Sequence, residues 1–335
     1  MTTALIFPGM GPASFDEVGS FMVANPIARE LVRIADETLG YSLVDAFRLA
    51  EGDYSHPAQI AFMINCLASA RWAVDRFGIE PDICVGPSFG QKAALAFAGV
   101  LSVPDAVRLT ARLAVCMDEY FAEEHTDIVT HSFVRVPADK LADLRAELDA
   151  VGEWNEISCY IDDGFFMLSL RESREEWLQQ RLRAVGGMSL YTMRPPMHCP
   201  QFAGLRDRVA DEVLPTLDFA DPRLPVMADQ DGTVLRTGAQ VAQMLLDGIV
   251  RPLRWPDVVT SLRSLGVRTV CVAGPDSLFG RVACTTNSFD VIPANPRLAM
   301  MPARRSGAYF NNRSSHVGSA IRTNSPEVPA IPVTG

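Results

Sequence analysis

Ser88 is the residue of this chain best suited by its sequence context to nucleophilic chemistry. It lies in Gly86-Pro87-Ser88-Phe89-Gly90, a G-x-S-x-G pattern that follows the apolar run Ile83–Val85. The next segment, 91–98, is rich in good helix formers. A serine on such a sharp strand-to-helix turn has its hydroxyl lifted clear of the sheet. The helix also directs its positive end to where an oxyanion would form, so we predict a nucleophilic Ser88.

A serine nucleophile needs a base within hydrogen-bond reach, and His198 is the best candidate. The chain has five histidines, at positions 56, 125, 131, 198 and 316. His198 lies among prolines in Pro195-Pro196-Met197-His198-Cys199-Pro200, which are expected to fix a loop. Spacing alone does not identify an acid that would orient the histidine. Four aspartates follow it without a supporting motif: Asp218, Asp221, Asp229 and Asp231.

The elements around these residues alternate between strand and helix, which predicts an α/β sheet layered by helices. A buried strand is expected at 4–7, followed by a turn rich in glycine and proline. Helices are expected near 28–39, over 58–77 and from Pro104 to about 121. We assign residues 1–126 and 194–300 to one large domain, and 301–335, which lose this periodicity, to a flexible tail.

Residues 127–193 have a different pattern and predict a small inserted subdomain. Strands are expected at 132–136, 156–161, 165–170 and 188–192, and helices at 138–151 and 172–185. The order β-α-β-β-α-β is that of a ferredoxin-like unit.

Composition excludes several classes of function. The net charge is −10, with no basic stripe to neutralise phosphates, so we expect no nucleic-acid partner. The seven cysteines lie singly, which is typical of reduced thiols and not of a disulfide framework or a zinc site. No apolar stretch is long enough to span a membrane, and the first residues do not resemble a signal peptide. We therefore expect a cytoplasmic monomer without a metal.

Five ordered motifs resemble those of the malonyl-CoA:acyl-carrier-protein transacylases and the acyltransferase domains of polyketide synthases. Phe7–Gly11 is similar to the family's F-P-G-Q-G, Gly86–Gly90 to its G-H-S-x-G, and His198 to its catalytic histidine. Pro252–Trp255 is similar to P-V-x-W, and Ala273–Leu278 to E-V-G-P-x-x-x-L. The resemblance covers roughly residues 4–285.

The resemblance implies an α/β-hydrolase-like domain with a ferredoxin-like insertion, and ping-pong transfer through an acyl-Ser88 ester. His198 would act first as base and then as acid, oriented by a backbone carbonyl near Gly248. The backbone amides of Met10 and Phe89 would form the oxyanion hole. No cofactor would be bound, because the acyl group arrives on the phosphopantetheine of an acyl carrier protein.

Departures from the family pattern concern the acyl group. Members that use malonyl units carry an arginine for its carboxylate; here Leu113 takes that position, counted back from Met117, and Arg112 precedes it. One residue on a helix turns a side chain by about 100°, so Arg112 is not expected to replace that arginine. Met197 precedes the histidine, and His56 replaces a glutamine. We therefore expect a non-malonyl acyl group, as in the stand-alone acyltransferases of macrolactam pathways, which transfer aminoacyl or dipeptidyl groups between carriers.

Three alternatives stay open at this point: an editing thioesterase, a malonyl-CoA transacylase and a non-catalytic carrier-binding protein. In every case the partner is an acidic carrier protein, so the resemblance implies a local basic docking face. Five arginines could form it: Arg194, Arg206, Arg208, Arg251 and Arg254.

Overall fold

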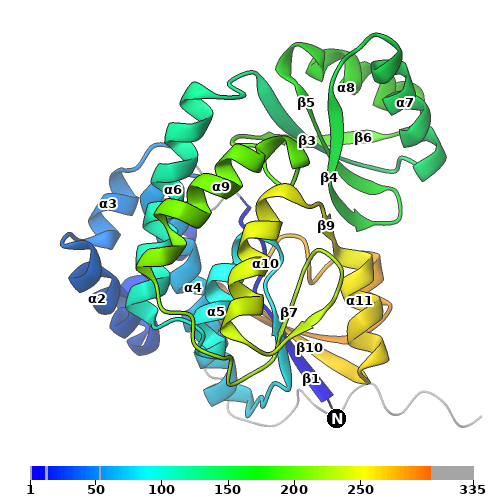
Figure 1. The fold of residues 1–335 in the computed structure, drawn as a ribbon. Coiled ribbons are helices and arrows are strands. Elements are labelled where there is room, and N and C mark those ends of the chain that lie inside the picture. The colour runs from blue at the N-terminus through cyan, green and yellow to red at the C-terminus, as the bar shows by residue number, and fades with distance from the viewer. Residues whose placement is uncertain (1, 12–13, 53, 303–335) are drawn as a thin grey trace, which may run out of the picture. The chain divides into compact units, whose positions relative to one another are not determined.

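A mostly parallel six-stranded sheet forms the centre of the large subdomain (Figure 1). The computed structural model describes residues 2–11, 14–52 and 54–302, and the predicted tail lies outside them beyond residue 302. In these residues the sheet has β8 antiparallel to β7 and all other neighbouring pairs parallel. Its strands, in spatial order, are β11 (Asp290–Ala294), β10 (Val267–Ala273), β1 (Thr2–Ile6), β2 (Ile83–Val85), β7 (Val226–Met227) and β8 (Val234–Leu235).

Both faces of this sheet are buried at its centre, which explains why segments 4–6, 83–85 and 270–273 are apolar at successive positions instead of alternating. In β1, Leu5 belongs to one hydrophobic cluster and Ala4 and Ile6 to another. Cys84 and its neighbours in β2 divide between the two clusters in the same way. The period of two sends successive side chains to opposite faces.

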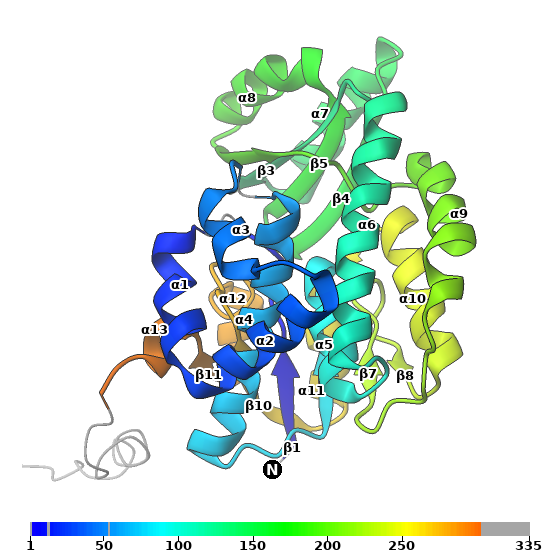
Figure 2. The same cartoon turned by 90° about the vertical axis from the view of Figure 1, so that its left-hand side faces the viewer.

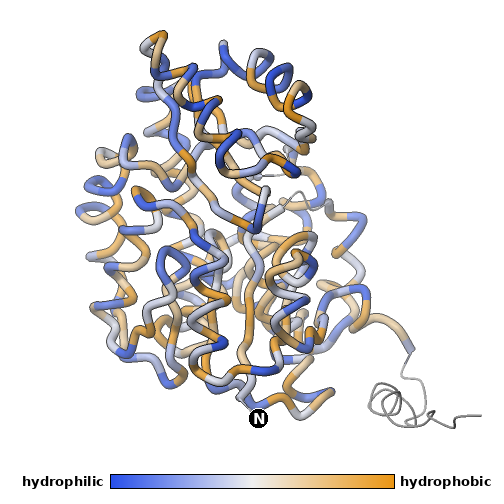
Figure 3. The backbone as a smooth tube through the Cα atoms, turned by 90° about the vertical axis from the view of Figure 1, so that its right-hand side faces the viewer, coloured by the Kyte–Doolittle hydropathy of each residue, from blue (hydrophilic) through white to orange (hydrophobic). Residues whose placement is uncertain are grey.

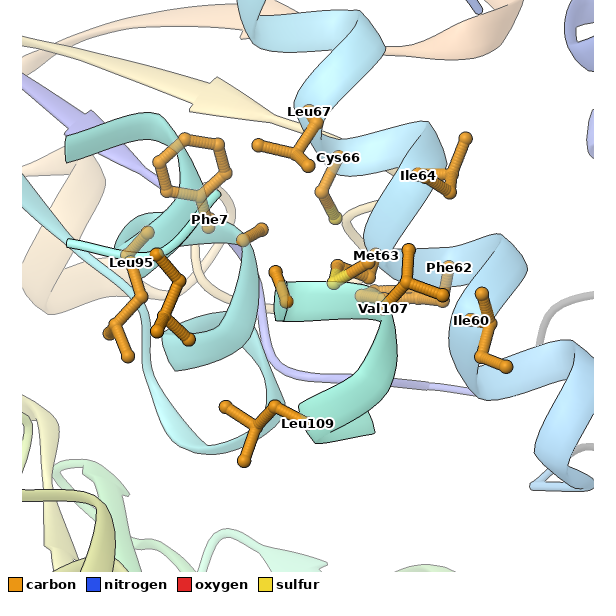
Figure 4. Packing of buried hydrophobic residues seen from close by; sticks show 14 of the residues in the cluster. Phe7, Ile60, Phe62, Met63, Ile64, Cys66, Leu67, Leu95, Val107 and Leu109 are labelled. Atoms are coloured by element: carbon orange, nitrogen blue, oxygen red, sulfur yellow. The ribbon is translucent and has the colours of Figure 1, made fainter. Parts of the chain in front are cut away.

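Most helices of the large subdomain pack into the first of these clusters. Figure 4 shows its centre, where Phe7 faces Leu95 of α5 and side chains of α4 and α6. The helices concerned are α1 (Phe15–Ala24), α2 (Pro26–Leu39), α3 (Leu43–Leu49), α4 (His56–Phe77), α5 (Gln91–Ala98), α6 (Val103–Glu123), α9 (Ala203–Glu212) and α10 (Gly238–Val250).

Helix α11 (Trp255–Ser264) covers the opposite face of the sheet, where Trp255 is fully buried. Short helices α12 (Ala283–Thr286) and α13 (Pro296–Ala299) flank β11 (Asp290–Ala294). Orange and blue segments alternate along many of the helices (Figure 3), as expected where a helix buries only one face.

The small subdomain has the element order that the sequence predicts. It contains β3 (Ile128–Val134), α7 (Ala138–Ala150), β4 (Asn155–Asp162), β5 (Phe165–Arg171), α8 (Glu175–Ala184) and β6 (Met188–Met193). The strands lie in the order β6-β3-β5-β4, and all of these pairs are antiparallel. A separate hydrophobic core holds α7 and α8 against one face of this sheet.

One strand of the small sheet was not predicted. β9 (Leu253–Arg254) comes from the large-subdomain part of the chain, yet it pairs in parallel with Cys159 and Tyr160 of β4. Two residues are too short for a periodic signal, so only the tertiary pairing reveals this strand.

The fold class expected from the sequence is confirmed: a helix-layered α/β sheet with a ferredoxin-like insertion. The chain crosses between the subdomains at 124–127 and again at 194–196. The carboxyl ends of β1 and its neighbours point toward the small subdomain (Figure 2). In open α/β sheets ligands bind at this edge of the strands. No helix in the described ranges is both long enough and apolar enough to cross a membrane.

Candidate active site

Ser88 lies on a tight turn between β2 and α5, where the sequence predicts it. Its φ of 52° is in the left-handed region, which a non-glycine residue seldom adopts. The flanking glycines are required because the backbone passes so close to itself. A Cβ on Gly86 would lie 2.2 Å from the Gly90 oxygen, and one on Gly90 would lie 2.0 Å from the Phe7 oxygen. The close packing around Gly86 and Gly90 therefore fixes the shape of the turn and holds Ser88 in its strained conformation.

His198 lies directly beside the serine although 110 residues separate them in the chain. Its Nε2 is 2.8 Å from the Ser88 Oγ, and its Nδ1 is 2.6 Å from the Gly248 carbonyl oxygen in α10. A carbonyl only accepts, so Nδ1 carries the hydrogen and Nε2 presents its lone pair to the serine hydroxyl. The ring is thus in the tautomer that a general base for Ser88 requires.

The surroundings keep this imidazole neutral. His198 is only 7% exposed. Burial is the main cause that lowers the pKa of His198 to about 4, and the charge of Lys92 lowers it further. The hydrogen bond to Gly248 acts in the opposite direction. At pH 7 the base is therefore unprotonated and ready to accept a proton.

A cavity of about 130 Å³ opens above Ser88 and His198 and is lined by both subdomains. Much of its wall is made of flexible, polarizable side chains, the five methionines Met10, Met117, Met167, Met193 and Met197. Four residues that carry hydroxyl groups also line the cavity: Thr130, Ser158, Tyr191 and Ser277. Such a wall suits an acyl chain that is largely apolar and carries neutral hydrogen-bonding groups.

Arg194 is the one lysine or arginine among the described residues that line the cavity. Its guanidinium is already engaged, because one nitrogen is 2.5 Å from Glu172 and another donates to the Thr126 carbonyl at 3.3 Å. A substrate carboxylate would have to compete with Glu172 for this cation.

The residues expected to form the oxyanion hole and the acyl pocket divide into two groups. Met10, Phe89, Met117 and Met197 line the cavity, whereas Leu113, Arg112 and His56 do not. Leu113 is buried in the hydrophobic core one helical turn before Met117, and Arg112 is exposed. His56 begins α4 and binds Asp118 of α6, with its Nε2 2.7 Å from the carboxylate. Leu113, the position assigned to the arginine that binds malonyl groups, therefore packs in the hydrophobic core. Contrary to the prediction, Leu113, Arg112 and His56 lie outside the cavity lining.

Each of the five arginines expected at a docking face has an acidic partner. Arg206 pairs with Asp207, Arg208 with Glu119 and Glu212, and Arg251 with Asp231 and Asp247. Arg254 pairs with Asp257 and lies over the Tyr160 ring. Nearby carboxylates therefore offset much of the positive charge on which the docking prediction rests.

Sequence reasoning found no partner for Asp229, but the structure places it against the nucleophile. It lies immediately beyond β7, and its carboxylate accepts a hydrogen bond from the Ser88 backbone N–H at 2.6 Å. The contact joins residues 141 positions apart, so only the parallel pairing of β2 with β7 could have suggested it. Among the described residues no group of three His, Cys, Asp or Glu side chains is arranged to hold a metal ion.

Several known proteins are similar to this chain in sequence. The family described as the VinK acyltransferase small domain matches residues 132–193. The malonyl CoA-acyl carrier protein transacylase of Bacillus subtilis is 23% identical over 300 residues, covering 87% of this chain and 73% of that protein. The polyketide biosynthesis protein ThaF of Burkholderia thailandensis is 27% identical over 81% of this chain but only 23% of its own length.

Solved structures show the same fold. A malonyl-transacylase in complex with a type II polyketide synthase acyl-carrier protein superposes with a TM-score of 0.78 at 21% identity, covering 89% of this chain and 97% of that chain. The acyl-carrier-protein S-malonyltransferase of Burkholderia pseudomallei 1710b also gives 0.78, at 20% identity, covering 89% and 98%. The resemblance that the five motifs indicate is therefore confirmed in sequence and in fold.

Proposed function

We propose that this chain, which is similar to the malonyl-CoA:acyl carrier protein transacylases, transfers a non-malonyl acyl group from one carrier-protein thioester to another through an ester on Ser88. The observation that carries the proposal is the hydrogen-bonded series Ser88–His198–Gly248 at the floor of a methionine-lined cavity. The match of residues 132–193 to the VinK acyltransferase small domain supports acyl transfer. From the resemblance to the acyltransferases of macrolactam pathways, we propose that the group is aminoacyl or dipeptidyl.

The geometry supports a two-step mechanism. In the first step His198 Nε2 accepts the Ser88 hydroxyl proton while Oγ attacks the thioester carbonyl. The backbone amides of Met10 and Phe89 would stabilise the resulting oxyanion. The C–S bond then breaks, and the leaving phosphopantetheine thiolate takes the proton from His198. In the second step the thiol of the accepting carrier gives its proton to His198 and attacks the ester carbonyl. The bond between the acyl carbon and Ser88 Oγ then breaks, and Oγ takes the proton back from His198.

The lack of a free cation in the described cavity lining gives the first prediction: wild-type protein loads malonyl groups at least about 100-fold more slowly than neutral or amino-acid-derived acyl groups. An ionised carboxylate left without a partner in a dry pocket costs about 3 kcal/mol, which corresponds to this factor. The measurement is intact-protein mass spectrometry after rapid quenching, with carrier proteins charged with a panel of acyl thioesters.

Two other outcomes would lead to different functions. Malonyl loading as fast as the neutral groups would make the chain a malonyl transacylase, and Arg194, released from Glu172, would be the candidate carboxylate partner. Steady release of free acid without an accepting carrier would instead indicate an editing thioesterase.

A second prediction concerns the carrier protein. The double variant Arg206→Glu/Arg208→Glu on α9 should lower kcat/KM for an acyl-carrier substrate by about 10-fold at low salt, mainly through the association rate, and less as salt rises. Turnover of a small acyl-pantetheine thioester should not change. The matched control is Arg33→Glu/Arg48→Glu on α2 and α3, where both arginines also pair with neighbouring acids. An equal effect of both double variants would remove α9 from the docking face.

A further inference from the structure

A buried carboxylate and a buried ammonium lie behind the nucleophile, outside the cavity. Asp229 is 1% exposed and Lys92, in the first turn of α5, is 8% exposed. Neither lines the cavity, so neither is placed to touch the substrate. Taking a charge out of water is expensive unless it is paired and hydrogen-bonded. Because both charges are buried beside the turn that carries Ser88, we expect them to contribute to the structure or chemistry of that turn.

Both oxygens of Asp229 are used by the turn that carries Ser88. Oδ2 accepts the backbone N–H of Ser88 at 2.6 Å, and Oδ1 accepts the side-chain amide of Gln91 at 2.7 Å. Hydrogen bonds to an ionised carboxylate are shorter and stronger than neutral ones. The Ser88 backbone has the left-handed φ of 52°, a conformation that costs on the order of 1–3 kcal/mol for a non-glycine residue. Asp229 thus holds the peptide at the strained residue itself.

Lys92 carries the opposite charge in the same buried region. Its Nζ lies 4.1 Å from the centre of the Phe89 ring, a cation–π contact with the residue that follows the nucleophile. Burial lowers the pKa of Lys92 to about 8, and the charge of Asp229 acts in the opposite direction. One buried cation therefore lies over the Phe89 ring and is acted on by the charge of Asp229, although the described residues show no direct ion pair between Lys92 and Asp229.

We propose that Asp229 is the positioning residue for the nucleophile, with Lys92 as its buried counter-charge: its carboxylate holds Ser88 in the conformation that directs Oγ to His198. The inference rests on the proposed acyl-Ser88 chemistry and adds to it a residue that the reaction scheme does not contain. Without the carboxylate, the Ser88 N–H is buried without an acceptor, and the turn can relax to an ordinary φ. Oγ would then lose its 2.8 Å contact with His198 Nε2.

The titration of Asp229 gives this role a signature that ordinary packing would not have. Burial is the main cause that raises the pKa of Asp229 to about 6, and the charge of Asp231 also raises it. The hydrogen bonds from Ser88 and Gln91 lower this pKa. The other ionisable groups facing this region are Lys92, Cys159 and His198. A protonated carboxyl has one accepting oxygen fewer, so Ser88 or Gln91 loses its bond. Nucleophile reactivity should therefore fall as the pH drops through about 6, while His198, with a pKa of about 4, is still neutral.

The experiment measures labelling of Ser88 by phenylmethanesulfonyl fluoride from pH 4.5 to 9, followed by intact mass. In this reaction Oγ displaces fluoride at sulfur and His198 takes the proton, so no natural acyl group or carrier is needed. The wild type should show an acid limb near pH 6. Asp229→Asn keeps an acceptor for the Ser88 N–H but cannot ionise. Like the protonated carboxyl, it is neutral and has one accepting oxygen, so at pH 8 it should label at the reduced rate that the wild type reaches just below pH 6, and its own acid limb should lie near pH 4. Asp229→Ala should label about 100-fold more slowly at pH 8, as expected for loss of a charged hydrogen bond.

Asp231→Asn is the matched control, because Asp231 is the neighbouring acid and pairs with Arg251 instead of Ser88. Because the charge of Asp231 raises the pKa of Asp229, this variant should keep the acid limb and move it only slightly below pH 6. The proposal is overturned if folded Asp229→Ala labels at the wild-type rate, or if Asp229→Asn keeps the wild-type acid limb. If Asp229→Ala does not fold, the acid limb in the pH profile of Asp229→Asn is sufficient to test the proposal. If the wild type labels as expected but transfers no acyl group to any carrier, the proposed function fails and the role of Asp229 stands.

Discussion

Ser88→Ala should form no acyl-enzyme with any thioester and should lose turnover by a factor on the order of 10⁶. The hydroxyl is the only atom of this residue that the mechanism uses, and it lies 2.8 Å from the base. Alanine keeps the backbone hydrogen bond from residue 88 to Asp229, so the turn should keep its shape. The measurements are the mass of the intact protein after incubation with acyl-carrier thioester, and the rate of acyl transfer to a second carrier.

Ser277→Ala provides the matched control, since Ser277 also lines the cavity with a hydroxyl group. It should acylate and turn over within a few-fold of the wild type. A stable acyl adduct on the Ser88→Ala variant would assign the nucleophile to another side chain and remove the basis of the ping-pong scheme.

The parts of the fold that could be predicted are those with a strong local signal. The turn at Ser88 combines an apolar strand, two glycines and a run of helix formers, and each of these restricts the backbone within a few residues. The small subdomain could also be predicted from the sequence, because each of its four strands and two helices between residues 128 and 193 has a clear local pattern. Boundaries differ from the predicted ones by a few residues at most elements, which is the usual uncertainty of helix and strand ends.

The parts that could not be predicted depend on contacts between distant segments. Asp229 reaches Ser88 because β7 pairs with β2, and nothing around residue 229 marks it among four similar aspartates. Part of the cavity wall comes from the small sheet, through residues such as Thr130, Met167 and Tyr191, and their position depends on how the subdomains pack. Leu113 shows a different limit of sequence-based prediction. Its position in a motif does not reveal whether the side chain points into a pocket or into the hydrophobic core, where it lies.

His198→Ala should reduce both acylation and deacylation by nearly as much as loss of the serine, on the order of 10⁵- to 10⁶-fold. The serine hydroxyl then has no lone pair to receive its proton, and the leaving thiolate has no acid to protonate it. Rapid-quench mass spectrometry measures the first step, and transfer from pre-formed acyl-enzyme measures the second. His56→Ala, which removes a histidine bound to Asp118 outside the cavity, should leave both rates unchanged.

The double variant Ser88→Ala/His198→Ala should be no slower than either single variant, because the two side chains act on one proton. Removing the serine leaves the histidine nothing to deprotonate, so the second substitution has nothing further to take away. Independent contributions would instead multiply and give a far larger loss. The geometry favours the first outcome: Nδ1 of His198 is fixed by the Gly248 carbonyl, so Nε2 can serve only the group that faces it, which is Ser88 Oγ. Residual transfer by the three variants, compared at equal protein concentration, is the measurement. If the double variant were slower than both single variants by a further 100-fold, His198 would have to act on the substrate independently of Ser88, and a water-mediated hydrolysis would replace the acyl-enzyme scheme.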